Sequence, residues 1–122
     1  MGMKILVVDD EPIIVKLLTN RLEVSGYDVI TATDGEKALE EVRREQPDLL
    51  ILDIVLPKID GYKLCELLKS DEKYSKIPVI MLSASVKKKD LEMAEKMGAD
   101  AYMVKPFNAR ELLSKIKELL EK

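Results

Sequence analysis

Five short runs of apolar residues recur along the chain, separated by longer amphipathic stretches. They lie at Lys4–Val8, about Asp28–Ala32, Leu49–Leu52, Pro78–Leu82 and Ala101–Val104. The third and fourth runs are apolar throughout, and the first is apolar after Lys4. Such continuous runs are typical of strands buried on both faces of a parallel sheet. The second run is the most polar, so we expect it at an edge of the sheet.

Each amphipathic stretch carries helix signals. Pro12 suits the first turn of a helix, and that helix is expected to stop near Gly26. The segment Thr33-Asp34-Gly35 opens a second helix, which ends near Glu45, before Pro47. The remaining three are expected at about Tyr62–Ser70, at about Lys87–Met97 before Gly98, and from the N-cap residue Asn108 to the end of the chain. Regular alternation of strand and helix predicts an α/β fold with five parallel strands and five helices on both faces of the sheet.

Composition narrows the class of protein. A chain of 122 residues with 47% apolar and 35% charged residues predicts one globular domain. The net charge of −3 gives no general attraction to nucleic acid, so no direct nucleic-acid partner is expected. No apolar run approaches the roughly 20 residues that span a bilayer, and no signal peptide is visible. The single cysteine, Cys65, allows no internal disulfide, which fits a reducing cytoplasm.

The chain has no histidine. This excludes histidine-based acid–base catalysis, Ser-His-Asp triads and histidine metal ligands. It also means that the chain cannot itself carry a phosphohistidine.

Polar residues follow four of the apolar runs. Asp9 and Asp10 come after the first run, Asp53 after the third, Ser83 after the fourth and Lys105 after the fifth. The carboxyl ends of parallel strands form the ligand-binding edge of an open α/β sheet. We therefore expect three carboxylates, a hydroxyl and an ammonium to lie close together there.

This set of groups indicates a definite chemistry. Carboxylates held close together repel, so at least one takes a proton or binds a cation. Their hard oxygen atoms, with no soft ligand nearby, suit Mg²⁺. Lys105 can pair with a carboxylate or a phosphate, and Ser83 can donate a hydrogen bond to a phosphoryl oxygen. Together these groups favour phosphoryl transfer onto a carboxylate.

Seven segments in a fixed order carry a family resemblance. They are Ile5–Glu11, Asp48–Asp53, Leu56-Pro57, Asp60-Gly61, Pro78–Ala84, Gly98–Tyr102 and Lys105–Phe107. With this spacing, the chain resembles the receiver domain of a two-component response regulator over its whole length, residues 1–122. The resemblance implies a flavodoxin-like sheet with strand order 2-1-3-4-5. It also implies a signalling phosphoacceptor rather than an enzyme acting on other substrates.

The resemblance also assigns roles to individual residues. Asp53 would accept a phosphoryl group from a phosphohistidine on a histidine kinase or a histidine phosphotransferase. Mg²⁺ would be bound by Asp10, Asp53 and the main-chain carbonyl of Val55, with Asp9 acting through water.

A conformational switch is implied in the same way. Ser83 and Lys105 would contact the phosphoryl group, and Tyr102 would rotate inward as Ser83 moves. The Lys105–Pro106 peptide bond would be cis. The face formed by the fourth helix, the fifth strand and the fifth helix would then present a changed surface to a downstream protein target.

The first helix has more apolar residues than one buried face needs. At 100° per residue, they form two stripes: Ile14, Val15, Leu18 and Leu22, and then Ile13, Leu17 and Val24. One interpretation is a broad buried face. The other is a partly exposed apolar patch at Ile13, Leu17 and Val24, where a helical kinase or phosphotransferase could dock.

Two alternatives compete with the phosphoacceptor hypothesis. A degenerate receiver could act as a binding module without phosphorylation, although the acidic, hydroxyl and lysine residues are all present. A fragment of an aspartyl-phosphate phosphohydrolase would need Asp-x-Asp at the nucleophile, whereas Asp53 is followed by Ile54 and Val55. A nucleotide-binding domain is unsupported, because the five glycines form no phosphate-binding loop.

Overall fold

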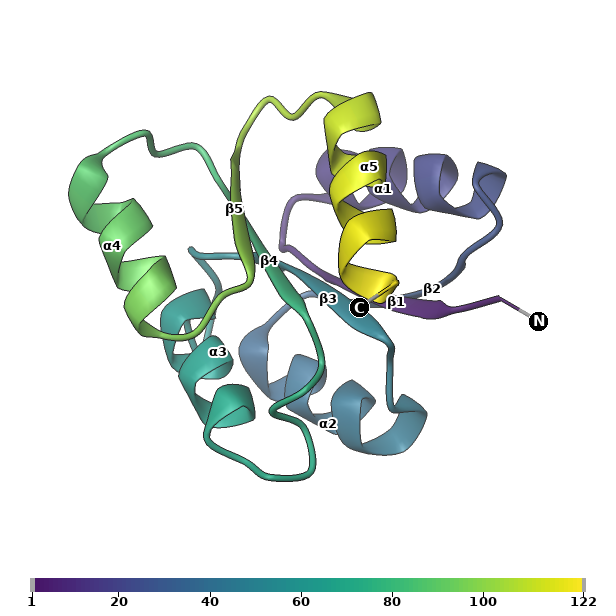
Figure 1. The fold of residues 1–122 in the computed structure, drawn as a ribbon. Coiled ribbons are helices and arrows are strands. Elements are labelled where there is room, and N and C mark those ends of the chain that lie inside the picture. Colours follow the sequence, from purple (N-terminus) through teal and green to yellow (C-terminus); the bar gives the residue numbers. More distant parts are fainter. Residues whose placement is uncertain (1, 122) are drawn as a thin grey trace.

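Strands and helices alternate strictly in the computed structural model, which describes residues 2–121 (Figure 1). The elements are β1 (Lys4–Val8), α1 (Pro12–Val24), β2 (Asp28–Ala32), α2 (Gly35–Glu45), β3 (Leu49–Asp53), α3 (Gly61–Lys69), β4 (Val79–Ser83), α4 (Lys88–Lys96), β5 (Ala101–Val104) and α5 (Ala109–Leu120). The α/β prediction is confirmed, and the boundaries agree with the expected ones to within two residues.

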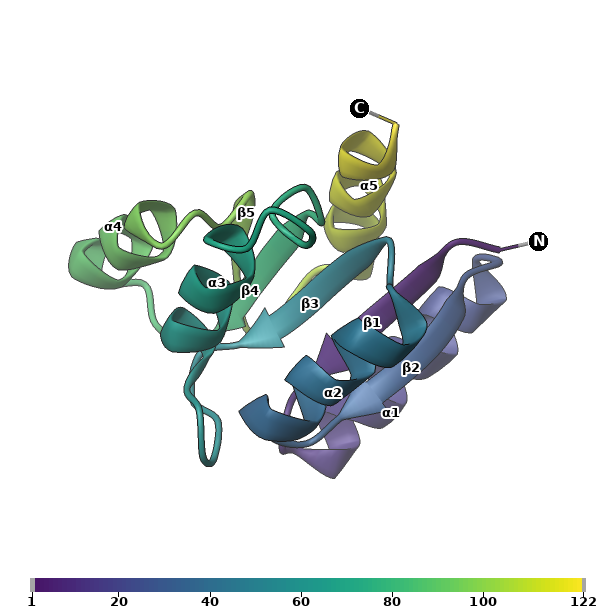
Figure 2. The same ribbon diagram turned by 90° about the horizontal axis from the view of Figure 1, so that it is seen from below.

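The strands form one parallel sheet with the order β2-β1-β3-β4-β5. The arrows of β1, β2 and β3 point the same way in Figure 2. The polar strand β2 lies at an edge, as its sequence predicts, and the expected strand order is confirmed. All five strands therefore end at one edge of the sheet.

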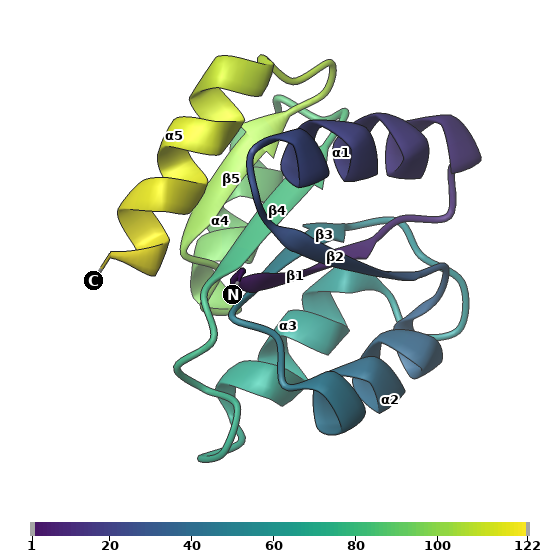
Figure 3. The ribbon, with the colours of Figure 1, turned by 90° about the vertical axis from the view of Figure 1, so that its right-hand side faces the viewer.

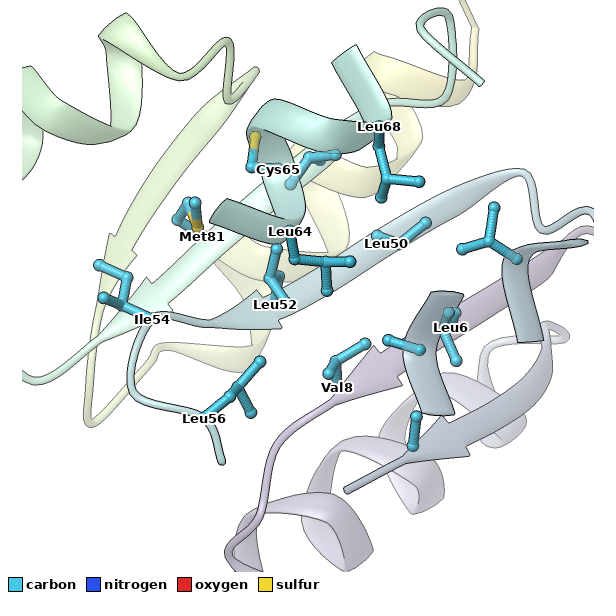
Figure 4. Packing of buried hydrophobic residues seen from close by; sticks show 14 of the residues in the cluster. Leu6, Val8, Leu50, Leu52, Ile54, Leu56, Leu64, Cys65, Leu68 and Met81 are labelled. Carbon is cyan, nitrogen blue, oxygen red and sulfur yellow. The ribbon is translucent and has the colours of Figure 1, made fainter. Parts of the chain in front are cut away.

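Two hydrophobic layers cover the sheet, because successive side chains of a strand point to opposite faces. On β1, Leu6 and Val8 pack with α2, α3 and α4, whereas Ile5 and Val7 pack with α1 and α5. Figure 3 shows α1 on one side of the sheet and α2 and α3 on the other. Figure 4 shows the first layer, in which the α3 residue Leu64 meets the strand residue Leu52. Because helices cover both faces of the sheet, polar side chains that bind a ligand are expected at the ends of the strands.

Side chains that cap the helices fix where three of them begin. Asp34, Asp60 and Asn108 each accept a hydrogen bond from the backbone N–H three residues later. Gly26 and Gly98 follow α1 and α4 with positive φ angles of 94° and 95°, a conformation that favours glycine.

Two strands end one residue later than their apolar runs predict. The parallel ladder pairs Asp53 with Leu82 and Ser83 with Val104, so backbone pairing continues through these polar residues. Asp53 and Ser83 are thus held by the sheet itself rather than by the loops after it.

Within residues 2–121, no helix is long and apolar enough to cross a membrane.

Candidate functional site

The polar residues of interest meet at the carboxyl edge of the sheet. Asp9 directly follows β1, Asp53 ends β3, Ser83 ends β4 and Lys105 directly follows β5. Since β1, β3, β4 and β5 are consecutive in the sheet, the four residues lie in a row along its edge.

Three carboxylates cluster at this edge. Asp9, Asp10 and Asp53 each offer an oxygen atom, and these atoms all lie within 4.8 Å of one another. Asp9 and Asp53 are buried, whereas Asp10 is exposed to solvent. The cluster therefore has a buried side formed by two strands and an open side next to α1.

Lys105 places one positive charge among these carboxylates. Its Nζ atom lies 2.9 Å from Oδ2 of Asp9, 3.4 Å from Oδ2 of Asp53 and 3.2 Å from Oε1 of Glu11. The Lys105 side chain is only 12% exposed, so water screens these contacts weakly. The contact with Glu11 was not predicted from the sequence, although Glu11 belongs to the conspicuous Asp9-Asp10-Glu11 run.

Backbone N–H groups hold the other carboxylate oxygens. The N–H of Glu11 donates to Oδ1 of Asp9 at 2.9 Å, and the N–H of Val55 donates to Oδ1 of Asp53 at 3.3 Å. Each buried aspartate thus has one oxygen facing a backbone donor and one facing Lys105, which fixes both carboxylate planes.

The charges in the site do not balance. Burial raises the pKa of Asp53 above its ordinary value, and the neighbouring charge of Asp9 raises it further, while Lys105 opposes both effects. Burial alone would lower the pKa of Lys105, but its hydrogen bond to Asp9 and the charge of Asp53 outweigh burial, so this pKa is raised. One ammonium thus faces three nearby aspartates and Glu11. The negative charge of the site is therefore only partly neutralised, and a bound cation would neutralise more of it.

The donor set fits a small hard cation. It consists of carboxylate oxygens, and no nitrogen or sulfur ligand belongs to the acidic cluster in the described part of the chain. Mg²⁺ prefers such oxygen ligands and keeps several waters, leaving positions for phosphate oxygens. Such an ion would neutralise charge on an incoming anion.

Ser83 and Tyr102 are linked through the loop between β4 and α4. The hydroxyl oxygen of Ser83 accepts a hydrogen bond from the N–H of Ser85 at 3.1 Å. The Tyr102 hydroxyl donates to the main-chain carbonyl of Ser85 at 2.9 Å. Lys105 is joined to the same strand end, because its N–H donates to the Ser83 carbonyl at 2.7 Å, and the Lys105–Pro106 bond is cis.

The two apolar stripes of α1 have different environments. Leu18 and Leu22 are buried, and Ile14 and Val15 are half-buried. The second stripe is exposed: Ile13 is 75% exposed, Leu17 50% and Val24 88%. The interpretation of one broad buried face is therefore wrong, and an apolar surface on α1 faces solvent.

A family model described as the response regulator receiver domain matches residues 5–117. The chain belongs to this family. As a receiver domain, it is part of two-component signal transduction, and the family resemblance inferred from the sequence is confirmed.

Curated relatives of this receiver domain are transcriptional regulators. The alkaline phosphatase synthesis transcriptional regulatory protein PhoP of Bacillus subtilis is 48% identical over 122 residues, which cover 100% of this chain and 50% of the relative. The DNA-binding dual master transcriptional regulator RpaA of a Synechocystis strain is 42% identical over 98% of this chain and 49% of the relative. The chain spans about half the length of these relatives.

Solved receiver domains have the same fold. A CheY-like response regulator receiver domain protein from Methanospirillum hungatei is 33% identical, with a TM-score of 0.92 over 99% of this chain and 95% of its own. The receiver domain of the sensor histidine kinase PA1611 from Pseudomonas aeruginosa is 29% identical, with a TM-score of 0.92 over 100% of both chains. The latter structure has a magnesium ion coordinated in its active-site cleft.

Proposed function

We propose that this receiver domain, residues 1–122, is a phosphoacceptor switch that takes a phosphoryl group onto Asp53 from a phosphohistidine of a partner kinase or phosphotransferase. A carboxylate oxygen of Asp53 forms a bond to phosphorus as the bond from phosphorus to the imidazole nitrogen breaks. The electron pair leaves with the imidazole, which remains on the partner. The product is an acyl phosphate at the end of β3.

One observation carries this proposal. The Asp53 carboxylate, only 7% exposed, lies at a strand end with Oδ2 at 3.4 Å from Lys105 and with Asp9 and Asp10 beside it. A buried nucleophile needs nearby positive charge to meet an anionic phosphoryl group, and this arrangement supplies it. Asp10, Asp53 and the main-chain carbonyl of Val55 would hold Mg²⁺, with Asp9 acting through water. When bound, the ion neutralises charge that develops on the phosphoryl oxygens.

The remaining residues have supporting roles in this proposal. Lys105 pairs with a phosphoryl oxygen, and Ser83 donates its hydroxyl hydrogen to another. Tyr102, bonded to the loop after Ser83, carries the change to the α4-β5-α5 face, where a downstream protein target would bind. The net charge of −3 gives this domain no general attraction to nucleic acid, so we expect no direct nucleic-acid contact from it.

The donor is expected to dock on α1. Ile13, Leu17 and Val24 form its exposed apolar surface, and this helix begins two residues after Asp10. None of the 122 residues is a histidine, so the phosphohistidine must lie outside this domain. We expect this exchange to occur in the cytoplasm.

The test is phosphorylation by a small donor. The purified domain is incubated with acetyl phosphate and Mg²⁺, and the covalent phosphoryl group is measured by intact mass. We expect labelling of the wild-type domain and none of Asp53→Asn or of wild-type domain treated with EDTA. Asp71→Asn, at an exposed turn between α3 and β4, is the matched control and should be labelled like the wild type.

The same experiment separates the competing hypotheses. Labelling of Asp53→Asn equal to that of the wild type would refute the assignment of Asp53. A wild-type domain that takes no label from acetyl phosphate or from any histidine kinase would favour the degenerate receiver that acts as a binding module. Phosphohydrolase activity is disfavoured, because Val55 rather than an aspartate stands two residues after Asp53.

A further inference from the structure

Ser85 joins three parts of the fold through hydrogen bonds. Its N–H donates to Oγ of Ser83 at 3.1 Å, and its carbonyl accepts from the Tyr102 hydroxyl at 2.9 Å. Its own hydroxyl makes a short hydrogen bond to the carboxylate of Asp90 in α4 and accepts from the N–H of Lys87 at 3.2 Å. The position of Ser85 therefore determines where a backbone N–H donor lies relative to the Ser83 hydroxyl.

Asp90 is in turn held from a third element. The hydroxyl of Tyr62, in α3, donates to Oδ1 of Asp90 at 3.2 Å and lies 3.3 Å from its main-chain carbonyl oxygen. The other carboxylate oxygen, Oδ2, takes the Ser85 bond. Asp90 thus connects the loop after β4 to both α3 and α4, through two oxygens with different partners.

This network leaves the Ser83 hydroxyl with a hydrogen to donate. A hydroxyl has one hydrogen and two lone pairs, and the N–H of Ser85 occupies one lone pair. Within residues 2–121, no side chain or backbone group accepts the hydrogen of Ser83. Ser83 is 7% exposed and ends β4, which pairs with β3, the strand that ends at Asp53. The hydroxyl hydrogen of Ser83 is therefore available to a group bound at Asp53.

We propose that Asp90, held by Tyr62, is a positioning residue for phosphoryl recognition. It fixes Ser85, and the N–H of Ser85 then holds the Ser83 oxygen so that the hydroxyl donates to a phosphoryl oxygen on Asp53. This inference rests on the proposed phosphorylation of Asp53. It adds a dependence of that site on Asp90 and Tyr62, which touch neither the acidic cluster nor Lys105.

The charges of the network agree with these directions of donation. The hydrogen bond from Ser85 lowers the pKa of Asp90, and the bond from Tyr62 lowers it further. Burial, followed by the charge of Asp90, raises the pKa of Tyr62 to about 12. At neutral pH, Asp90 is therefore a charged acceptor and Tyr62 a protonated donor, and such charge-assisted bonds are stronger than neutral ones.

The test measures binding of beryllofluoride, an analogue of the phosphoryl group, in the presence of Mg²⁺. We expect Asp90→Ala to weaken this binding by about three- to tenfold and Tyr62→Phe by about two- to threefold, the loss typical of one or two hydrogen bonds. Binding of Mg²⁺ alone should stay unchanged in both variants, because neither residue belongs to the acidic cluster. Glu92→Ala is the matched control, since Glu92 is an exposed carboxylate on the same helix.

A double-mutant cycle separates positioning from a general effect on folding. If Asp90 acts through the Ser83 hydroxyl, Asp90→Ala has no further effect once Ser83→Ala has removed that hydroxyl. Equal losses in both backgrounds, or normal binding by both Asp90→Ala and Tyr62→Phe, would overturn the inference. If the wild-type domain binds no beryllofluoride with Mg²⁺, the proposed function is overturned as well. If the wild type binds normally and both variants bind equally well, only the role of Asp90 and Tyr62 is overturned.

Discussion

Lys105 Nζ lies 2.9 Å from Oδ2 of Asp9, although the strands that precede these two residues are not neighbours. Two strands, β3 and β4, separate β1 from β5 in the sheet. The lysine side chain therefore reaches over the ends of both strands, and it passes Asp53 on β3 at 3.4 Å. One ammonium group connects the edges of the site and compensates part of its buried negative charge.

Removing this charge should destabilise the domain. In Lys105→Gln, the buried carboxylate of Asp9 loses its cation, so we expect the free energy of unfolding at pH 7 to fall by about 1–3 kcal/mol. Urea denaturation without Mg²⁺ measures the change. Lys4→Gln is the control, because the side chains of the Lys4–Glu45 ion pair are 43% and 30% exposed, so water screens this pair better and it should contribute less than about 1 kcal/mol. Equal effects of the two substitutions would contradict the role of Lys105.

Asp53 should have the opposite effect on stability when no metal is present. Its pKa is raised by burial and by Asp9, so the charged form is favoured less in the folded than in the unfolded chain. The resulting penalty is absent below the ordinary pKa of 3.8 and is complete once the pH exceeds the folded-state pKa. We therefore expect Asp53→Asn to raise the melting temperature at pH 7 by about 2–5 °C in EDTA, and to leave it unchanged near pH 3.

Mg²⁺ provides the control for this prediction. The ion should raise the melting temperature of the wild type and have a smaller effect on Asp53→Asn, since one ligand is lost. Asp10→Ala should give a smaller rise in EDTA than Asp53→Asn, because Asp10 is exposed and water screens its repulsion. A melting temperature of Asp53→Asn at or below that of the wild type in EDTA at pH 7 would show that the pocket is not crowded with negative charge.

Asp34 offers a separate prediction about acid stability. Its carboxylate caps α2 by accepting from the N–H of Lys37 at 2.9 Å, and this bond is the main cause of its lowered pKa, to which nearby Lys58 also contributes. Because the folded-state pKa is lowered, the charge of Asp34 stabilises the fold fully above pH 3.8, and this contribution is lost as the pH falls below that value.

The measurement compares Asp34→Asn with the wild type. Asparagine keeps a cap but carries no charge, so the wild type should melt a few degrees higher at neutral pH. The difference should shrink as the pH falls below 3.8 and disappear once the pH has passed below the lowered pKa of Asp34. A difference that stays constant over this range would assign the effect to the shape of the cap rather than to its charge.

Much of the site could be predicted because parallel strands end at one edge. The apolar runs locate the strands, and the alternation with helices makes them parallel, so Asp9, Asp53, Ser83 and Lys105 had to converge. The cap residues Asp34 and Asn108 similarly fixed where two helices begin. These predictions depend only on the period of the pattern and on local backbone chemistry.

Other features depend on side-chain directions that the sequence does not contain. Asp9 and Asp10 are identical neighbours, yet Asp9 is buried and Asp10 exposed, because successive side chains of an extended segment point to opposite sides. The contact of Asp90 with Tyr62 joins residues 28 positions apart through loops whose paths carry no periodic signal. Neither the different burial of Asp9 and Asp10 nor the Asp90–Tyr62 contact can be predicted without the three-dimensional arrangement of the side chains.

The apolar surface of α1 gives the last prediction. Leu17 is 50% exposed on the face of α1 that is turned away from the core, whereas its neighbour Leu18 is buried. If a histidine kinase docks here, Leu17→Gln should reduce the rate of phosphotransfer from that kinase by about tenfold, the loss expected for one well-packed interface residue. Labelling by acetyl phosphate needs no docking and should not change.

Leu67→Gln is the matched control for this substitution. Leu67 is 39% exposed on α3, which packs on the opposite face of the sheet from α1, so its substitution has a similar chemical effect away from the proposed surface. We expect Leu67→Gln to behave like the wild type with both donors. Phosphotransfer to Leu17→Gln at the wild-type rate would show that the kinase docks elsewhere. Slower labelling of Leu17→Gln by acetyl phosphate would show instead that the substitution disturbs the acceptor site itself.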